Sequence, residues 1–97
     1  MVTVTEYNGR KLGPNLYNTS FSPRVQWSAR DRSNAEVKGE NCQIEVAFPN
    51  TSRATYKSAA CKDAVPFRVS YGKPGVYSII VTDRVSGARA TQTFTIE

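Results

Sequence analysis

Histidine is absent from this chain of 97 residues. Its absence removes the commonest general base, every Ser-His-Asp or Cys-His arrangement, and the commonest zinc ligand. The eight acidic residues stand in polar or turn settings, which do not favour the carboxylate pair of a glycosidase. We therefore predict that the chain is not an enzyme and that it holds no metal and no cofactor.

Long apolar runs are also missing. No run exceeds four residues, so we expect neither a signal peptide nor a membrane span in this chain. Apolar residues nowhere recur at helical spacing for three turns, and no long helix is predicted. The strand-like pattern that follows Met1 favours an excised domain whose export signal lies outside the chain.

Cysteine is scarce, with Cys42 and Cys61 as the only two. An even count in a small domain rich in Ser, Thr and Asn is typical of an exported protein. A bridge between them would close a loop of roughly 20 residues and contribute on the order of 3 kcal/mol. The alternative is two buried free thiols in a cytosolic protein. We predict the disulfide, and with it an extracellular, cell-surface or periplasmic location.

Concentrated charge is missing as well. The formal net charge is +5, from 13 basic and 8 acidic residues, and the basic residues are scattered except for the pair Arg10-Lys11. Such a balance attracts anionic surfaces or glycans only modestly. Trp27 lies on the opposite face of its strand from Arg24 and Arg30, unlike the mixed basic and aromatic face of a single-strand binder, so nucleic-acid binding is not expected.

What the sequence does contain is period-two alternation, the pattern of strands with one buried face. In residues 24–30, Val25, Trp27 and Ala29 share one face, and residues 42–48, 67–71 and 90–96 alternate in the same way. We predict an all-β fold, an antiparallel sandwich of about seven strands forming a single domain over residues 1–97, monomeric when isolated. The side chains assigned to the core are Trp27, Ile44, Val46, Phe67, Val69, Ile79, Val81 and Phe94.

Turn signals separate these strands. Asn8-Gly9 predicts a tight hairpin turn, and Ser86-Gly87 predicts the turn between the last two strands. Residues 75–83 carry apolar side chains on both faces, as a central strand covered twice or a strand with a contact face would. Residues 8–23 form a stretch of 16 residues with little periodicity, which indicates either a functional loop or an irregular edge strand.

A family resemblance rests on the run Lys-Pro-Gly-Val-Tyr-Ser-Ile-Ile-Val-Thr-Asp at residues 73–83, followed by Ser86-Gly87 and a Thr-rich final strand. This run resembles the last hairpin of immunoglobulin-like and fibronectin type III-like modules of surface or secreted proteins. Trp27 and residues 43–48 are similar to core strands of a fibronectin type III domain. The resemblance implies an immunoglobulin-like sandwich with Tyr77 as a tyrosine corner. Cys42 and Cys61 do not fit the cysteine pair of antibody domains, because neither lies on the Tyr77 strand.

Two functions follow as hypotheses. The first is a non-catalytic extracellular or cell-surface module for protein interaction, adhesion or spacing within a larger protein. The second is a stand-alone secreted binder, such as a glycan-binding domain, inhibitor or effector, that uses loops at one end of the sandwich. In either case the partner is a protein or a glycan at a surface. The candidate contacts are Arg10, Lys11, Tyr17, Arg53 and Tyr56, although tyrosines in such places also clamp loops.

Overall fold

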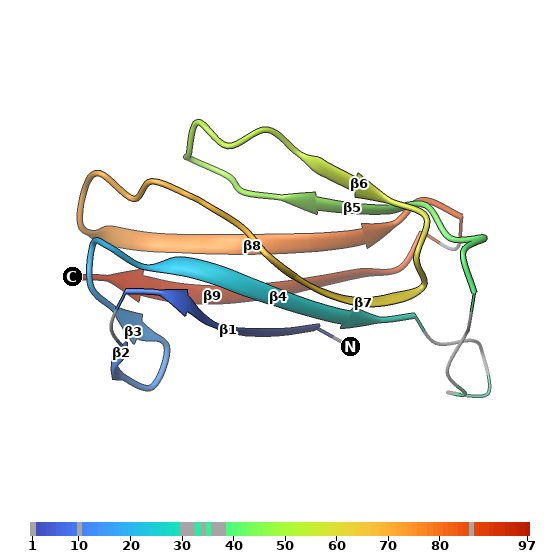
Figure 1. Ribbon diagram of the computed structural model, residues 1–97, viewed down its shortest axis with the longest axis horizontal. Helices are drawn as coiled ribbons and strands as arrows, with labels where there is room; N and C mark the ends of the chain where they lie inside the picture. Colours follow the sequence, from blue (N-terminus) through green and yellow to red (C-terminus); the bar gives the residue numbers. More distant parts are fainter. Residues whose placement is uncertain (1, 10, 30–32, 34, 36–38, 86) are drawn as a thin grey trace.

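The structure is a computed structural model that describes residues 2–9, 11–29, 33, 35, 39–85 and 87–97, with only Val4 among the side chains of the first strand (Figure 1). These residues contain no helix. The strands are β1 (Val2–Asn8), β2 (Lys11–Gly13), β3 (Leu16–Tyr17), β4 (Ser22–Ser28), β5 (Ile44–Ala47), β6 (Tyr56–Ser58), β7 (Lys62–Pro66), β8 (Gly75–Asp83) and β9 (Arg89–Ile96). The predicted all-β class is confirmed.

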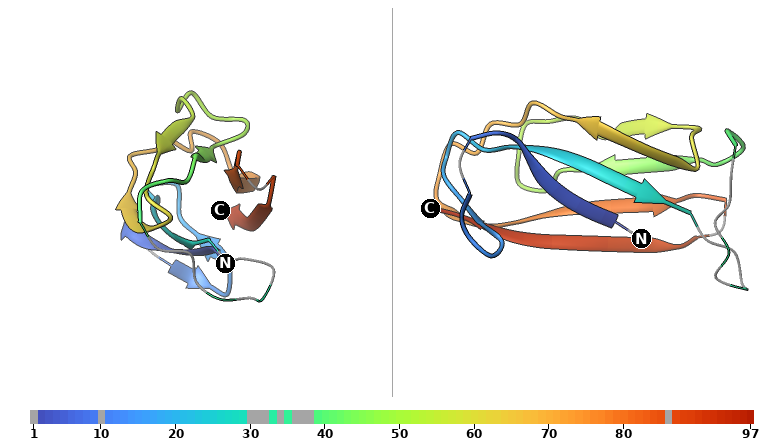
Figure 2. Two further views of the ribbon diagram at one scale, coloured as in Figure 1. Left: turned by 90° about the vertical axis from the view of Figure 1, so that its right-hand side faces the viewer. Right: turned by 60° about the horizontal axis from the view of Figure 1, so that its bottom comes forward.

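The strands form two sheets that face one another around one core (Figure 2). One sheet has three strands in the order β1-β4-β7, and the other has six in the order β2-β3-β9-β8-β5-β6. The molecule is elongated along the strands, with extents of 38 × 25 × 18 Å. Each sheet presents its alternate apolar side chains to the other, so the period-two pattern of the sequence becomes the filling of the sandwich.

The prediction of purely antiparallel sheets is wrong at one pair. Leu16 and Tyr17 of β3 lie parallel to Thr95 and Ile96 of β9, so the six-stranded sheet is mixed. Thr95 N–H donates to the Asn15 carbonyl at 2.8 Å and Glu97 N–H to the Tyr17 carbonyl at 2.9 Å. A two-residue strand inside an aperiodic stretch carries too little pattern to reveal its direction, which is fixed by the edge of β9 beside it.

The predicted hairpin at Asn8-Gly9 is also wrong. β1 pairs with β4, and β2 pairs with β3, so the chain changes sheets at Gly9 instead of folding back. Gly9 has the positive φ expected of a turn residue, 88°. A Cβ placed there would lie 2.4 Å from the Phe21 Cα, which no side chain allows. The glycine therefore permits the crossing of two backbone segments.

The remaining hairpin matches its prediction. β8 and β9 pair antiparallel from Gly75↔Ile96 to Thr82↔Arg89, and Gly87, with φ of 77°, lies in the turn between them. The eight side chains assigned to the core are each at most 6% exposed. On the outer face of β8, Val76 is 66% exposed and Ile80 is partly exposed, so no second layer of described residues covers them.

Candidate functional site

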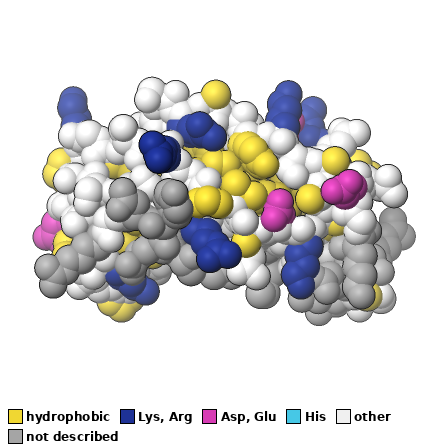
Figure 3. Space-filling view, viewed as in Figure 1, with side chains coloured by type: hydrophobic (Ala, Val, Ile, Leu, Met, Phe, Trp, Pro, Cys, Tyr) yellow, Lys and Arg dark blue, Asp and Glu magenta, His cyan; other side chains and the backbone are white. Residues whose placement is uncertain are grey.

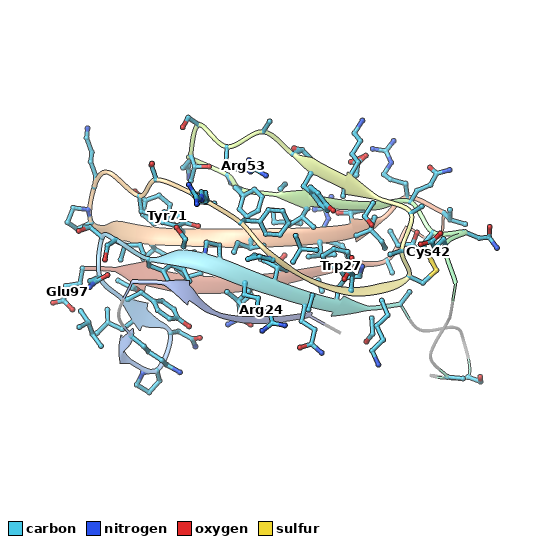
Figure 4. The ribbon with its side chains drawn as sticks, in the orientation of Figure 1. Arg24, Trp27, Cys42, Arg53, Tyr71 and Glu97 are labelled. Carbon is cyan, nitrogen blue, oxygen red and sulfur yellow. A yellow bond between two sulfur atoms is a disulfide. The ribbon has the colours of Figure 1, made fainter. Side chains whose placement is uncertain are left out.

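A disulfide joins the two sheets at one end of the sandwich. Cys42 precedes β5 of the larger sheet, Cys61 precedes β7 of the smaller one, and their sulfur atoms are bonded (Figure 4). Around the bridge, Cys42 N–H donates to the Ala59 carbonyl and Cys61 N–H to the Gly39 carbonyl, at 3.1 and 3.0 Å. Trp27 Nε1–H donates to the Ala60 carbonyl at 3.0 Å. The predicted Cys42–Cys61 bond is present and fixes this end of the molecule.

Tyr77 lies at the other end, near the start of β8. Its hydroxyl donates to the Lys73 carbonyl, four residues upstream, at 2.7 Å. The hydroxyl therefore bonds back to the backbone shortly before the strand, as the predicted tyrosine corner requires. The hydrogen bond is solvent-exposed, which lowers its contribution to stability below that of a buried one.

Tyr71 packs beside Tyr77 but has a different environment. Its ring is 2% exposed and lies 4.7 Å from the Tyr77 ring and 5.5 Å from the Phe94 ring. The hydroxyl is buried and has no hydrogen-bond partner among the described residues. Burial, and secondarily the neighbouring Tyr77 hydroxyl, raises the pKa of Tyr71 well above its usual range, so the group stays a donor. Sequence reasoning missed this residue.

Tyr71 borders a shallow, hydroxyl-lined depression at this end of the sandwich. The depression lies between the segment before β4 and the segment after Phe67, and its lining residues are Thr19, Ser20, Ser22, Val69, Ser70, Tyr71 and Gly72. One wall therefore comes from the aperiodic stretch of residues 8–23. We call this feature the hydroxyl-lined depression.

The fold places the predicted contact residues that the structure describes in different parts of the molecule. Arg10 lies outside the described residues, and Lys11 is exposed on β2. Tyr17 is 3% exposed and stacks on Phe21 with ring centroids 3.9 Å apart, so it belongs to the core and is not placed to contact a ligand. Arg53 and Tyr56, in contrast, both lie close to one aromatic ring.

That ring belongs to Phe67, which directly follows β7, an edge strand of the smaller sheet. The Phe67 ring lies 5.0 Å from the Tyr56 ring and 4.9 Å from the Phe48 ring, both edge to face. The Arg53 guanidinium carbon lies 5.6 Å from its centroid, within cation–π range. Phe67 itself is 1% exposed, so Arg53 covers an aromatic cluster that belongs to the core.

The Arg53 loop is held in place by its own hydrogen bonds. Asn50 takes a φ of 62°, which turns the chain after β5. Thr51 Oγ1 donates to the Phe48 carbonyl at 2.7 Å and accepts the Arg53 N–H at 3.2 Å. The arginine is exposed, yet its backbone is tied to the strand end that also carries Phe48.

Two further arginines lie near the place where β6 and β7, one edge strand of each sheet, run beside one another. Arg24 pairs with Pro66 across β4 and β7, and Arg68 follows Phe67; both are exposed. Figure 4 shows Arg53 at the loop before β6 and Arg24 on β4, and Figure 3 shows a central apolar patch with Lys and Arg side chains, and also acidic ones, around it. We call this surface the arginine–aromatic seam: Arg24, Arg53, Tyr56, Val65, Pro66, Phe67 and Arg68.

The part of the chain that contains β6 and β7 is richer in basic than in acidic residues. Residues 46–82 contain five basic side chains, Arg53, Lys57, Lys62, Arg68 and Lys73, and a single acid, Asp63. This stretch includes β6, β7 and their flanking loops. β6, β7 and their flanking loops therefore carry more basic than acidic side chains, with Asp63 of β7 as the acid among them.

Comparisons with known proteins add no family. No protein-family model, curated protein or solved structure matches the chain. In the part of the chain that the structure describes, no group of three or more His, Cys, Asp or Glu side chains could hold a metal ion. Nor is any helix of those residues long and apolar enough to cross a membrane.

Proposed function

We propose that this chain is a non-catalytic, immunoglobulin-like module of an exported or cell-surface protein, and that it acts through contact with a partner. The supporting observation is the strand order. β1-β4-β7 corresponds to strands A-B-E of immunoglobulin-like sandwiches, and β9-β8-β5-β6 corresponds to G-F-C-C′. The Tyr77 hydrogen bond to Lys73, at the start of the strand equivalent to F, supports the same subfold.

Export is supported by the Cys42–Cys61 bond, because disulfides persist in oxidising compartments. Its position differs from the antibody bridge, since it links the segments before the strands equivalent to C and E. The module is therefore proposed as immunoglobulin-like in topology and distinct from antibody domains in its covalent link.

Partner contact is favoured over spacing alone by the arginine–aromatic seam, where basic side chains border partly exposed apolar ones on a fixed scaffold. A second candidate function, a secreted glycan binder, is favoured by the hydroxyl-lined depression, where Thr19, Ser20 and Ser70 are exposed. The two functions depend on different interactions. The interaction module would bind through charge and apolar contact, and the glycan binder through hydrogen bonds between neutral groups.

An amide NMR titration of the folded domain separates these functions. The panel holds neutral polysaccharides and matrix proteins with acidic segments. Shifts confined to residues 53–56 and 65–68 support the interaction module, whereas shifts confined to residues 19–22 and 69–72 support the glycan binder. If no ligand of the panel shifts any amide signal, both contact functions are contradicted and the domain remains a spacer.

A further inference from the structure

We propose that the arginine–aromatic seam is a docking surface for an acidic, extended segment of a protein partner. In this proposal, which rests on the contact function above, carboxylates of the segment pair with Arg24, Arg53 and Arg68. Apolar side chains of the segment cover Tyr56, Val65 and Pro66 between them. The chemistry that the seam recognises is thus alternating negative and apolar side chains.

The arginines are available for such pairing. Within the described part of the chain, none of the three has a carboxylate within ion-pair distance; the ion pair seen there joins Arg84 to Glu45 on the outer face of the larger sheet. The Arg53 guanidinium carbon lies 5.6 Å from the Phe67 centroid, and the side chain is exposed, so its N–H groups can meet a carboxylate. Arginine forms bidentate pairs with carboxylates, which supply both strength and orientation.

The apolar part of the seam is what favours a peptide over a sulfated glycan. Tyr56 and Val65 are partly exposed and pack on the core, and Pro66 is exposed. A polysulfated chain offers charge but no apolar side chains to cover this area. A segment with apolar residues removes that surface from water, which favours binding.

The edge of β7 also limits how the segment binds. Strand addition to a free edge uses unpaired backbone donors. Here the Ala64 N–H is already taken by Asp63 Oδ1 at 2.8 Å, and Pro66 has no N–H. Such blocking is how proteins protect edge strands from unwanted pairing. The segment therefore lies across the seam and is held by side chains, without extending the sheet.

Three ten-residue peptides test the proposal by isothermal titration: Glu alternating with Leu, Glu alternating with Ser, and Lys alternating with Leu. The expected order is tightest for Glu/Leu, weaker for Glu/Ser and no binding for Lys/Leu. Arg53→Gln and Arg24→Gln should each weaken Glu/Leu binding by about tenfold, the loss of one charge-assisted pair. The matched control is Arg89→Gln, an exposed arginine of β9 far from the seam, which should leave binding unchanged.

Several outcomes would overturn the docking surface. The first is equal binding of the Glu/Leu and Lys/Leu peptides. The second is that Arg89→Gln weakens Glu/Leu binding as much as Arg53→Gln and Arg24→Gln do. The third is that the Glu/Leu peptide does not bind at millimolar concentration. A heparin-type oligosaccharide that binds with the same arginine dependence, when Glu/Leu does not, would make the seam a glycan site. The docking surface can be wrong while the proposed contact function is right. In that case, protein partners would shift amide NMR signals of residues outside the seam.

Discussion

The hydroxyl groups of two neighbouring tyrosines, Tyr71 and Tyr77, have different effects on the stability of the fold. Tyr71 and Tyr77 pack ring against ring, but only Tyr77 has an acceptor for its hydroxyl among the described residues. A buried donor without a partner costs about 1–3 kcal/mol of desolvation, whereas a satisfied one contributes about 0.5–1.5 kcal/mol. The two hydroxyls therefore act in opposite directions.

Replacing each tyrosine by phenylalanine should reveal this difference. Tyr71→Phe is expected to leave the free energy of unfolding unchanged or to raise it by about 1 kcal/mol, because the unsatisfied hydroxyl is removed. Tyr77→Phe, the matched control, is expected to lower it by about 0.5 kcal/mol, since its hydrogen bond is exposed. Urea unfolding measures both. A loss of more than about 1 kcal/mol in Tyr71→Phe would mean that this hydroxyl has a partner.

The raised pKa of Tyr71 also predicts a pH dependence. In the unfolded chain a tyrosine ionises near pH 10, whereas burial keeps Tyr71 protonated to higher pH in the fold. Below about pH 10 Tyr71 is protonated in both the folded and the unfolded chain, whereas at higher pH its ionisation favours the unfolded chain and lowers the free energy of unfolding. The stability of the wild type should fall more steeply than that of Tyr71→Phe between about pH 10 and 11. Parallel stability curves for the two proteins would contradict the buried environment.

Sequence reasoning found Tyr77 and missed Tyr71 for a physical reason. Tyr77 stands at a fixed position after a Pro-Gly turn, so its acceptor lies four residues away along the same chain. The surroundings of Tyr71 depend on residues 19–22, which are distant in sequence and are positioned by the crossing at Gly9. In the same way, the pairing of Arg53 with Phe67 depends on contact between two sheets. No local pattern encodes either.

Among the strands, β8 and β9, which are joined by a short turn, could be predicted from the sequence. β2 and β3, which follow the change of sheet at Gly9, could not. The bounds of β8 coincide with the predicted residues 75–83, because its turn and its alternation are both local. β2 and β3 could be anticipated only as an irregular edge within residues 8–23. Their placement depends on Gly9, where the chain leaves one sheet for the other.

The crossing at Gly9 can be tested by adding a single methyl group. Gly9→Ala should lower the free energy of unfolding by more than about 2 kcal/mol, since the residue has positive φ and its Cβ would overlap the Phe21 backbone. Gly87→Ala is the control, because it has a similar φ of 77° but no atom within 4 Å of the added Cβ. It should cost only about 1 kcal/mol. Equal losses in thermal or urea unfolding would contradict the close crossing.

The whole molecule is a small sandwich whose two sheets are joined covalently at one end and by the Gly9 crossing at the other. A domain of this size buries only about 60–65% of its unfolded surface, so a bridge that constrains the unfolded chain is a large part of its stability. Loss of the Cys42–Cys61 bond should cost on the order of 3 kcal/mol. The domain is therefore expected to work where that bond persists.

The central claim, an exported module that acts through contact with a partner, requires that this bond be formed in the producing cell. The direct measurement is rapid alkylation of the protein in its native cells without reductant, followed by fractionation and intact mass. We expect protein outside the cytoplasm that carries no label, and two labels per chain only after reduction. Protein found in the cytoplasm with both cysteines labelled before reduction would contradict the account.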